Sequence, residues 1–328
     1  MTAARLVELW RGGLCESAHL GHAVIADAGG IVEAWGNPAA VIYPRSSCKM
    51  IQALPLVESG AADAAGLSTE HLALACASHQ GGAAHVGRVR AWLAGLGLED
   101  EDLRCGAHLP ADPAERKRLV CSDESPCQAH NNCSGKHAGF LTLVRHVKAG
   151  PEYVAIDHPV QRAVRRAFEE VTGETAAGWG IDGCSAPNFA CTLEGLARAM
   201  AAFARPGPGR RGEAQARLVQ AMIAHPDLVA GEGRACTALM RALRGRAAVK
   251  TGAEGVFVGI VPERGLGIAL KISDGATRGS EAAITALLLH LGLLDAGDPV
   301  VDALLTGPQR NWRGLVTGGL RLAAGFPA

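Results

Sequence analysis

The sequence predicts a three-layer α/β fold, with a sheet built from strands at both ends of the chain and a largely helical region between them. Segments typical of strands, with glycine pairs at the corners, fill the first forty residues, and strand character returns near residue 245. Between these ends, apolar residues recur at helical spacing. A late apolar segment, "SEAAITALLLHLGLL", is typical of a helix that lies across a sheet.

The expected elements follow in order along the chain. Strands are expected in "RLVELWRGG", "HAVIADAGG" and "IVEAWGNP", and a buried helix from Ser47 to about Ser59. Further helices are expected at 82–95, 134–147, 158–172, 192–204 and 212–224, with a surface loop at 204–213. The segments "RAAVKTGAEGVFVGIV" and "GLGIALKISDG", separated by the turn "PERG", indicate a hairpin.

A chain of 328 residues can bury a large core, and no stretch of it is typical of a flexible linker. We therefore expect a single domain over residues 1–328, with an α/β part at about 1–60 and 245–328 and a helical part at about 61–244.

The charges exclude two classes of partner. The chain has 32 basic and 32 acidic residues, which are scattered, so no basic patch for nucleic acid or an anionic membrane is present. Arg5, Glu8 and Arg11 interrupt the first apolar stretch, which argues against a secretory signal, and no run of about 18 apolar residues predicts a membrane span. We expect a cytoplasmic protein that binds a small molecule and keeps its 10 cysteines reduced.

Lysine is rare in this chain, because only six of the 32 basic residues are lysines. A composition that uses arginine for most cations leaves lysine for roles that require the loss of a proton, which arginine cannot lose near neutral pH. The lysines of the following motifs are therefore candidates for chemistry.

Ser46 and Lys49 form the only S-x-x-K pattern of the chain, where the helix from Ser47 is expected to begin. Residues three apart on a helix share one face. A neutral amine beside a serine hydroxyl can take its proton and so make the oxygen nucleophilic. The alternative is an N-cap serine followed by a lysine that extends to solvent.

Lys250 and Ser78 extend this pattern. Lys250 begins "KTG" on the first strand of the expected hairpin, and Ser78 lies in "CASHQGG" in the helical region. An early S-x-x-K, a polar residue in the helical region and a late K-T-G occur in this order in serine β-lactamases and penicillin-binding proteins. Taken alone, Lys250 would be interpreted as an edge-strand lysine that discourages aggregation.

A second group of residues suits a metal ion. Cys133 and Lys136 lie three apart at the start of a helix, and Asp182 and Cys184 follow in a loop bounded by glycines. Two thiolates and a neutral amine can hold zinc with water in the fourth place. Lysine is an unusual ligand and the cysteine spacing is not a standard zinc spacing, so core thiols are the alternative.

With both groups in view, the sequence resembles the rhizobial-type, or class 3, L-asparaginases, a family with a serine β-lactamase-like fold. The resemblance covers nearly the whole chain and rests on "YPRSSCKMIQALPL", "CASHQGG", "HNNCSGKHAGFL", "GIDGCSAPNFA", "KTGAEGVF", "GIALKISDG" and "NWRGLVTGGLR". It implies a serine β-lactamase-like three-layer sandwich and an amidohydrolase that acts on free L-asparagine.

The resemblance also assigns residues, motif by motif. The family's two Ser-Lys pairs correspond to Ser46 with Lys49 and Ser78 with Lys250, its metal ligands to Cys133, Lys136 and Cys184, the acidic residue beside them to Asp182, and a further cysteine near the site to Cys236. The chain departs from the pattern at Ser47, an additional serine inside the motif. Ser47 lies two residues from Lys49 and faces away from it on a helix.

The resemblance implies that Ser46 attacks the side-chain amide carbon, with Lys49 taking its proton directly or through Ser78. Asp182 is expected to bind the α-amino group of the substrate and Arg45 a carboxylate. Backbone amides at the helix start and at 252–255 are expected to hold the oxyanion. Zinc is expected to shape the substrate pocket and not to generate the nucleophile, and the family suggests a homodimer.

Three alternatives stay open at this point. They are a β-lactam-recognising serine acyl hydrolase, a glutaminase-type serine acyl hydrolase and a non-catalytic zinc-binding protein. The first kind works outside the cytoplasm, and the last would not need Ser46.

Overall fold

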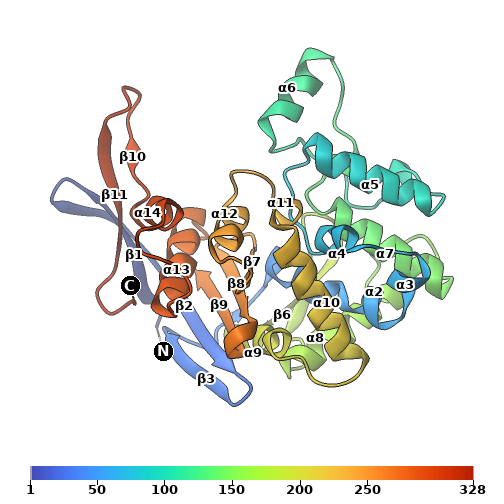
Figure 1. The fold of residues 1–328 in the computed structure, drawn as a ribbon, viewed down its shortest axis with the longest axis horizontal. Helices are drawn as coiled ribbons and strands as arrows, with labels where there is room; N and C mark the ends of the chain where they lie inside the picture. The colour runs from blue at the N-terminus through green and yellow to red at the C-terminus, as the bar shows by residue number, and fades with distance from the viewer. Residues whose placement is uncertain (1, 328) are drawn as a thin grey trace. The chain divides into compact units, whose positions relative to one another are not determined.

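The computed structural model describes residues 2–327 and divides the chain into two compact units. Unit 1 combines Met1–Ser47, Cys191–Arg205 and Ala238–Ala328, and unit 2 combines Cys48–Ala190 and Pro206–Thr237. Figure 1 labels most of the helices and strands of both units.

Unit 1 is built on an eight-stranded antiparallel sheet with the strand order β10-β11-β1-β2-β9-β8-β7, in which β3 also pairs with β2. The strands are β1 (Ala4–Arg11), β2 (Leu14–Asp27), β3 (Gly30–Trp35), β7 (Ala248–Thr251), β8 (Val256–Val261), β9 (Leu266–Ile272), β10 (Gln309–Arg310) and β11 (Val316–Leu322). The predicted sheet of N-terminal and C-terminal strands is therefore confirmed.

The long strand β2 holds the two ends of the chain together. Gly21 of β2 pairs with Ala4 of β1, and Ala23 pairs with Trp35 of β3. Both Gly21 and Ala23 also pair with β9. Because a strand has two edges, β1 and β3 must lie end to end along one edge of β2, and β9 must lie along the other.

Helices cover both faces of the central strands. Every residue of β8 is buried, and neighbouring residues of a strand point to opposite faces. Helix α9 (Leu193–Ala204) packs against β2, β8 and β9, and helix α13 (Thr277–His290) packs against β1, β8 and β9 (Figure 1). The unit also contains β4 (Val41–Ile42), η4 (Pro262–Arg264) and α14 (Pro299–Thr306). The predicted mixed α/β architecture is confirmed.

Unit 2 is mostly helical, as predicted for the middle of the chain. Its helices are α1 (Lys49–Gln52), α2 (Leu54–Glu58), α3 (Ala61–Ala64), α4 (Thr69–Ala75), α5 (Ala83–Gly95), α6 (Pro113–Cys121), α7 (Ser134–Val147), α8 (Pro159–Thr172), α10 (Arg210–Ala224) and α11 (Pro226–Val229). It also contains the 3-10 turns η2 (Asp100–Asp102) and η3 (Gln128–His130) and a hairpin of β5 (Gly178–Ile181) with β6 (Pro187–Thr192). The last two residues of β6 and the end of α12 (Ala235–Ala242) belong to unit 1.

The five helices predicted between residues 82 and 224 correspond to α5, α7, α8, α9 and α10. The helix predicted from Ser47 to Ser59 is wrong in one respect, because it is not continuous. A 3-10 turn, η1 (Arg45–Cys48), leads into α1, and α2 begins anew with Pro55 in its first turn. Proline has no N–H to continue the hydrogen-bond ladder, and its ring clashes with the preceding turn.

Two further predictions need correction. The segment "RAAVKTGAEGVFVGIV" forms two strands, β7 and β8, and not one. Glu254 and Gly255 in the turn between them have φ of 58° and 69°, a left-handed conformation that ends an extended strand. The loop predicted at 204–213 is shorter, because α10 already begins at Arg210. Across residues 2–327, no helix combines the length and the apolar character that crossing a bilayer requires.

The packing of α9 on β9 yields a test of the fold. A Cβ added at Gly267 of β9 would lie 2.2 Å from both Ala197 O and Ala201 N of α9. Since these are backbone atoms, Gly267→Ala should lower the free energy of unfolding by about 2–3 kcal/mol in urea titrations. The control Gly13→Ala, which meets no atom within 4 Å, should change it by less than about 0.5 kcal/mol. Wild-type stability of Gly267→Ala would contradict this packing.

Candidate active site

The predicted site residues are divided between the units. Unit 1 contains Arg45, Ser46 and Lys250, and unit 2 contains Lys49, Ser78, Cys133, Lys136, Asp182, Cys184 and Cys236. Each unit therefore holds one serine and one lysine of the two predicted Ser-Lys pairs.

In unit 1, Ser46 lies in a strained turn. Arg45, directly before it, has φ of 53°, a conformation that is uncommon for residues other than glycine and that clusters at functional sites. Ser47 is fully buried, and its Oγ donates to Pro44 O at 2.7 Å. Ser46 is only partly buried. The turn thus uses Ser47 as a structural residue and favours Ser46 as the serine for chemistry.

The K-T-G motif of β7 lies against this turn. A Cβ added at Gly252 would lie 2.6 Å from Pro44 O and 3.2 Å from Ser47 N, so only glycine permits this approach. Lys250 is fully buried, and its Nζ donates to Thr251 O at 2.7 Å. An edge-strand lysine that protects against aggregation would face solvent, so that alternative is wrong.

The predicted oxyanion donors at 252–255 need a correction. Residues 252–255 form the turn between β7 and β8 and are not part of a strand. The N–H of Gly252 already donates to Val256 O at 2.7 Å. A donor from this segment would therefore have to come from residues 253–255.

In unit 2, Lys49 is a buried amine surrounded by acceptors. Its side chain is 1% exposed, and Nζ lies 3.0 Å from Ser78 Oγ and 3.5 Å from Asn132 O. Nζ also hydrogen-bonds Ala77 O. A lysine that extends to solvent is therefore excluded. Burying a polar nitrogen costs several kcal/mol unless it is hydrogen-bonded, and here each contact offsets part of that cost.

The backbone places Ser78 beside Lys49. Ser78 follows helix α4, and its N–H donates to Val229 O at 2.8 Å. The next residue, His79, donates from its backbone N–H to Asn132 O at 3.2 Å. Asn132 O thus receives one hydrogen bond from the Ser78 segment and one from Lys49. This shared acceptor fixes the lysine and the serine segment relative to each other.

The second predicted group also comes together within unit 2. Lys136, on the first turn of α7, donates from Nζ to Cys184 Sγ at 3.1 Å. Cys133, the residue before α7, lies 3.2 Å from Asn132 Oδ1 through its Sγ and hydrogen-bonds Cys184. All three side chains are buried. The sequence prediction that these residues form one cluster agrees with these contacts.

The two cysteines of this cluster differ in acidity. The hydrogen bond from Cys133, together with the Lys136 ammonium, holds the pKa of Cys184 well below its usual value despite burial. The same hydrogen bond and burial raise the pKa of Cys133 well above its usual value. Burial alone would lower the pKa of Lys136, but the two cysteine sulfurs raise it. Of the two cysteines, Cys184 is therefore the more acidic.

His137 also lies beside this cluster. Arg104 N–H donates to Tyr153 OH at 2.7 Å, and His137 Nδ1 lies 2.9 Å from the same oxygen. His137 Nε2 is buried and meets no partner at hydrogen-bond geometry in the described part of the chain; burial lowers the pKa of His137, and the neighbouring Cys184 sulfur offsets part of that effect. In the sequence, the position of His137 directly after Lys136 could have indicated that it lies near the site.

The loop after β5 presents Asp182 beside this cluster. Asp182 Oδ1 accepts from Gly183 N at 2.7 Å, and Oδ2 accepts from Asn188 Nδ2 at 3.4 Å. Ser185 has φ of 68°, so the loop is strained where it carries Cys184. Cys236 lies buried in the first turn of α12.

The metal prediction is not tested by a bound ion. In residues 2–327, no three His, Cys, Asp or Glu side chains are grouped closely enough to hold a metal. The candidate set therefore depends on Lys136 as its third member. Two sulfurs and one nitrogen, buried together, fit the ligand preference of zinc.

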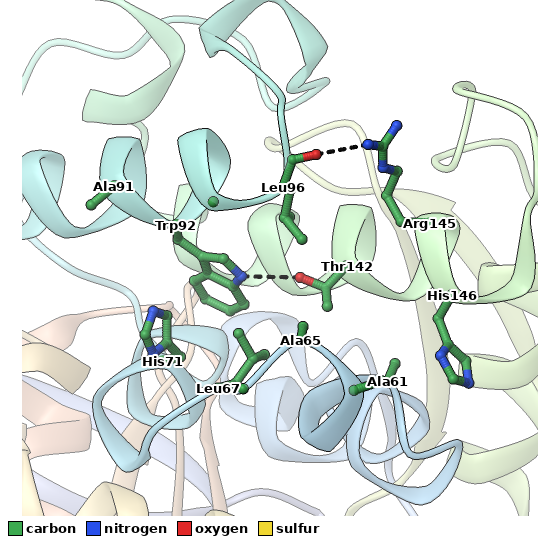
Figure 2. Close-up of a pocket in the computed structure, with 13 residues that line it drawn as sticks. Ala61, Ala65, Leu67, His71, Ala91, Trp92, Leu96, Thr142, Arg145 and His146 are labelled. Carbon is green, nitrogen blue, oxygen red and sulfur yellow. Dashed lines mark hydrogen bonds between the residues drawn. The ribbon is translucent and has the colours of Figure 1, made fainter.

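A separate cavity of about 430 Å³ lies elsewhere in unit 2. Figure 2 shows Trp92, whose Nε1 donates to Thr142 Oγ1 at 3.0 Å, and Arg145, which donates to Leu96 O at 2.9 Å. None of the predicted site residues lines this cavity. It is therefore distinct from the candidate active site.

Comparisons with known proteins identify relatives. The family described as L-asparaginase II matches residues 7–322. No curated protein matches the sequence significantly. Among solved structures, a β-lactamase from Mycobacterium bovis is similar over 84% of this chain and 95% of that chain, with 14% identity and a TM-score of 0.47. The protein Mglu, in its tris and glutamate form, is similar over 85% of this chain and 61% of that chain, with 16% identity and a TM-score of 0.49.

The burial of His79, the residue after Ser78, predicts that the stability of the protein depends on pH. His79 is buried and stacks on His85 at 4.8 Å, and burial holds its pKa well below the usual value. Below about pH 6.5 the unfolded chain binds a proton at this histidine that the folded protein does not bind. The free energy of unfolding should therefore fall from pH 7.5 to 5.5, by up to about 1.4 kcal/mol per pH unit for this group. His79→Gln should give a shallower slope; equal slopes would contradict the assignment.

Proposed function

Because this chain belongs to the L-asparaginase II family, we propose that it hydrolyses the side-chain amide of free L-asparagine through an acyl-enzyme on Ser46. Family membership makes the protein an amidohydrolase of the L-asparaginase type. The observation that carries the finer proposal is the buried Lys49 amine, with Nζ 3.0 Å from Ser78 Oγ.

The partners of Lys49 suit a proton acceptor. A neutral amine has two N–H groups and one lone pair. In the structure, Nζ donates to Ala77 O, Ser78 Oγ and Asn132 O. The proposal requires that Lys49 loses one proton, so that its lone pair accepts from the Ser78 hydroxyl in place of the donation to Ser78 Oγ. In the proposed reaction the Ser46 proton passes to Lys49, directly or through Ser78, for which Lys250 is the expected second lysine.

The proposed reaction has two halves. Ser46 Oγ bonds to the amide carbon, and the C–N bond breaks as the leaving nitrogen takes up the proton and departs as ammonia. Water then attacks the ester, releases aspartate and returns the proton to Ser46. We assign Asp182 to the α-ammonium group of the substrate, Arg45 to its carboxylate, and Cys236 to the surroundings of the substrate. The backbone hydrogen bond from Gly183 supports the Asp182 assignment, because it orients the carboxylate.

We propose that Cys133, Lys136 and Cys184 hold zinc that shapes the substrate pocket. The proposal takes Cys184 as a thiolate and Lys136 as an ammonium in the metal-free cluster, which makes the cluster neutral. Binding of Zn²⁺ with loss of one proton each from Cys133 and Lys136 keeps the cluster neutral. When bound, the metal would supply a fixed positive centre beside Asp182. No proton transfer of the reaction depends on it.

We further propose that the enzyme acts as a homodimer in the cytoplasm, without a nucleic-acid or membrane partner. The family resemblance supports the dimer, and the balanced, scattered charge supports the absence of those partners.

The two adjacent serines provide a matched test of the nucleophile. Ser46→Ala should lower ammonia release from L-asparagine more than about 1,000-fold with the fold intact by circular dichroism, because no nucleophile remains. Ser47→Ala removes only the hydrogen bond to Pro44 O and should keep most of the activity. The proposal fails if Ser46→Ala retains more than a few per cent of wild-type turnover.

The same assay distinguishes the alternatives. Ammonia release from L-glutamine above that from L-asparagine would favour a glutaminase, and rapid turnover of a chromogenic cephalosporin would favour a β-lactam-recognising enzyme. We expect asparagine to be the preferred substrate and the cephalosporin to remain intact.

Removing one metal ligand should separate substrate binding from chemistry. Cys184→Ala should lose bound zinc, measured by elemental mass spectrometry, and should raise KM for asparagine about tenfold or more with a smaller change in kcat. The control Cys76→Ala, also a buried thiol, should keep zinc and KM. Full zinc content in Cys184→Ala would contradict the ligand assignment, and an unchanged KM would contradict the role of the metal.

A further inference from the structure

Three side chains of unit 2 outside the candidate active site form a continuous hydrogen-bonded line. Cys127 Sγ lies 3.2 Å from His130 Nδ1, and His130 Nε2 lies 3.3 Å from Glu115 Oε1. A nucleophile, a base and an acidic group that orients the base are the parts of an activated nucleophile. The three residues come from the loop before η3, from η3 itself and from α6.

The backbone fixes which nitrogen of His130 carries the hydrogen. The N–H of Cys127 lies 3.1 Å from His130 Nδ1 and can only donate, so Nδ1 is an acceptor. Nε2 then carries the hydrogen and donates it to Glu115. Cys127 Sγ lies 3.2 Å from the same Nδ1, so the backbone N–H and the thiol share its lone pair, and the ring is in the tautomer that can accept the thiol proton.

Two further groups donate to the sulfur of Cys127. The Arg90 guanidinium, on α5, donates from Nη2 to Cys127 Sγ at 3.4 Å. The backbone N–H of His130 also donates to this side chain. A cation and N–H donors around a cysteine stabilise its thiolate over its thiol.

The surrounding structure holds the line in place. Asp112 caps α6 by accepting from the N–H of Glu115 at 2.8 Å, which fixes the helix turn that carries the carboxylate. Asp100 accepts from the N–H groups of Gln128 and Ala129 at 2.9 and 2.7 Å and so fixes η3. His130 and Glu115 are buried, whereas Cys127 is partly exposed and can be reached from solvent.

We propose that Cys127 is a reactive thiol that undergoes exchange with low-molecular-weight disulfides. His130 Nδ1 takes the thiol proton, and the sulfur attacks one sulfur of the disulfide. A new S–S bond forms as the old one breaks, and the other half leaves as a thiolate. A thiol reductant reverses the modification. The inference is independent of asparagine hydrolysis, because none of these residues belongs to the candidate active site.

The contacts between Cys127 and His130 also cap the 3-10 turn η3, so a structural role has to be separated from reactivity. A cap needs neither Glu115 nor Arg90. A free cysteine is only a few per cent thiolate at pH 7, so a base that takes the proton should raise the exchange rate about tenfold.

The chain contains its own controls for the test. Cys15 and Cys121 are exposed, Cys127 is partly exposed, and the other seven cysteines are buried. Variants that keep only one of these three accessible thiols, by Cys→Ser substitution of the other two, would be mixed with 5,5′-dithiobis(2-nitrobenzoate) at pH 7. The rate of release of the coloured thiolate gives the rate constant of each site, and peptide mass spectrometry confirms the site.

The protein that keeps Cys127 should react at least about tenfold faster than the one that keeps Cys121, although Cys121 is more exposed. His130→Gln should lower the rate at Cys127 to that at Cys121. Arg90→Gln, at an exposed position, and Glu115→Gln, which removes a positioning residue, should each lower the rate at Cys127 severalfold. Loosening of the fold exposes thiols and raises their rates, so a fall in rate cannot come from unfolding. Equal rates at Cys127 and Cys121, or a fast Cys127 that is unaffected by His130→Gln, would overturn the proposal.

Discussion

The amine of Lys49 has to find its hydrogen-bond partners inside the protein, because its side chain is almost completely buried. Three acceptors from two segments of unit 2 surround it: Ala77 O and Ser78 Oγ after α4, and Asn132 O before α7. An unpaired amine in this place would cost several kcal/mol, so these segments can pack together only in an arrangement that pairs it. The same constraint places a hydroxyl within hydrogen-bonding distance of a lysine nitrogen, which is the basis of the proposed proton transfer.

Asn132 connects this amine to the sulfur cluster. Its backbone oxygen accepts from Lys49 and from the His79 N–H, while its side-chain oxygen lies 3.2 Å from Cys133 Sγ. A change at the cluster, such as metal binding with loss of the Cys133 proton, can therefore affect Lys49 and Ser78 through Asn132 alone. The proposed metal site and the proposed proton acceptor therefore share Asn132 as a common neighbour.

Local patterns predicted much of this molecule. The apolar periodicity located α5, α7, α8, α9 and α10, and the strand segments at both ends located the sheet. The pairing of Lys136 with Cys184 agrees with the predicted cluster, because the C-x-x-K pattern and the family motifs mark these positions. Pro55 could have predicted the break in the first helix, since its effect on the helix is local.

Other features could not be read from the sequence, because they depend on contacts between distant segments. The hydrogen bond of His137 depends on Tyr153, and the tautomer of His130 on the backbone of Cys127 and on Glu115. The burial of Lys250 on an edge strand depends on what covers that strand. A sequence pattern does not show which distant residues will contact a given side chain. These contacts determine the tautomer of a histidine and the burial of a lysine.

The central claim is that Ser46 carries the acyl group during turnover. Acid quenching of the wild-type protein during turnover of L-asparagine, followed by fragmentation of the peptide that contains Ser46, Ser47 and Cys48, measures this directly. The account predicts an aspartyl ester on Ser46 Oγ. An acyl group on Ser47, Cys48 or any other residue would contradict it.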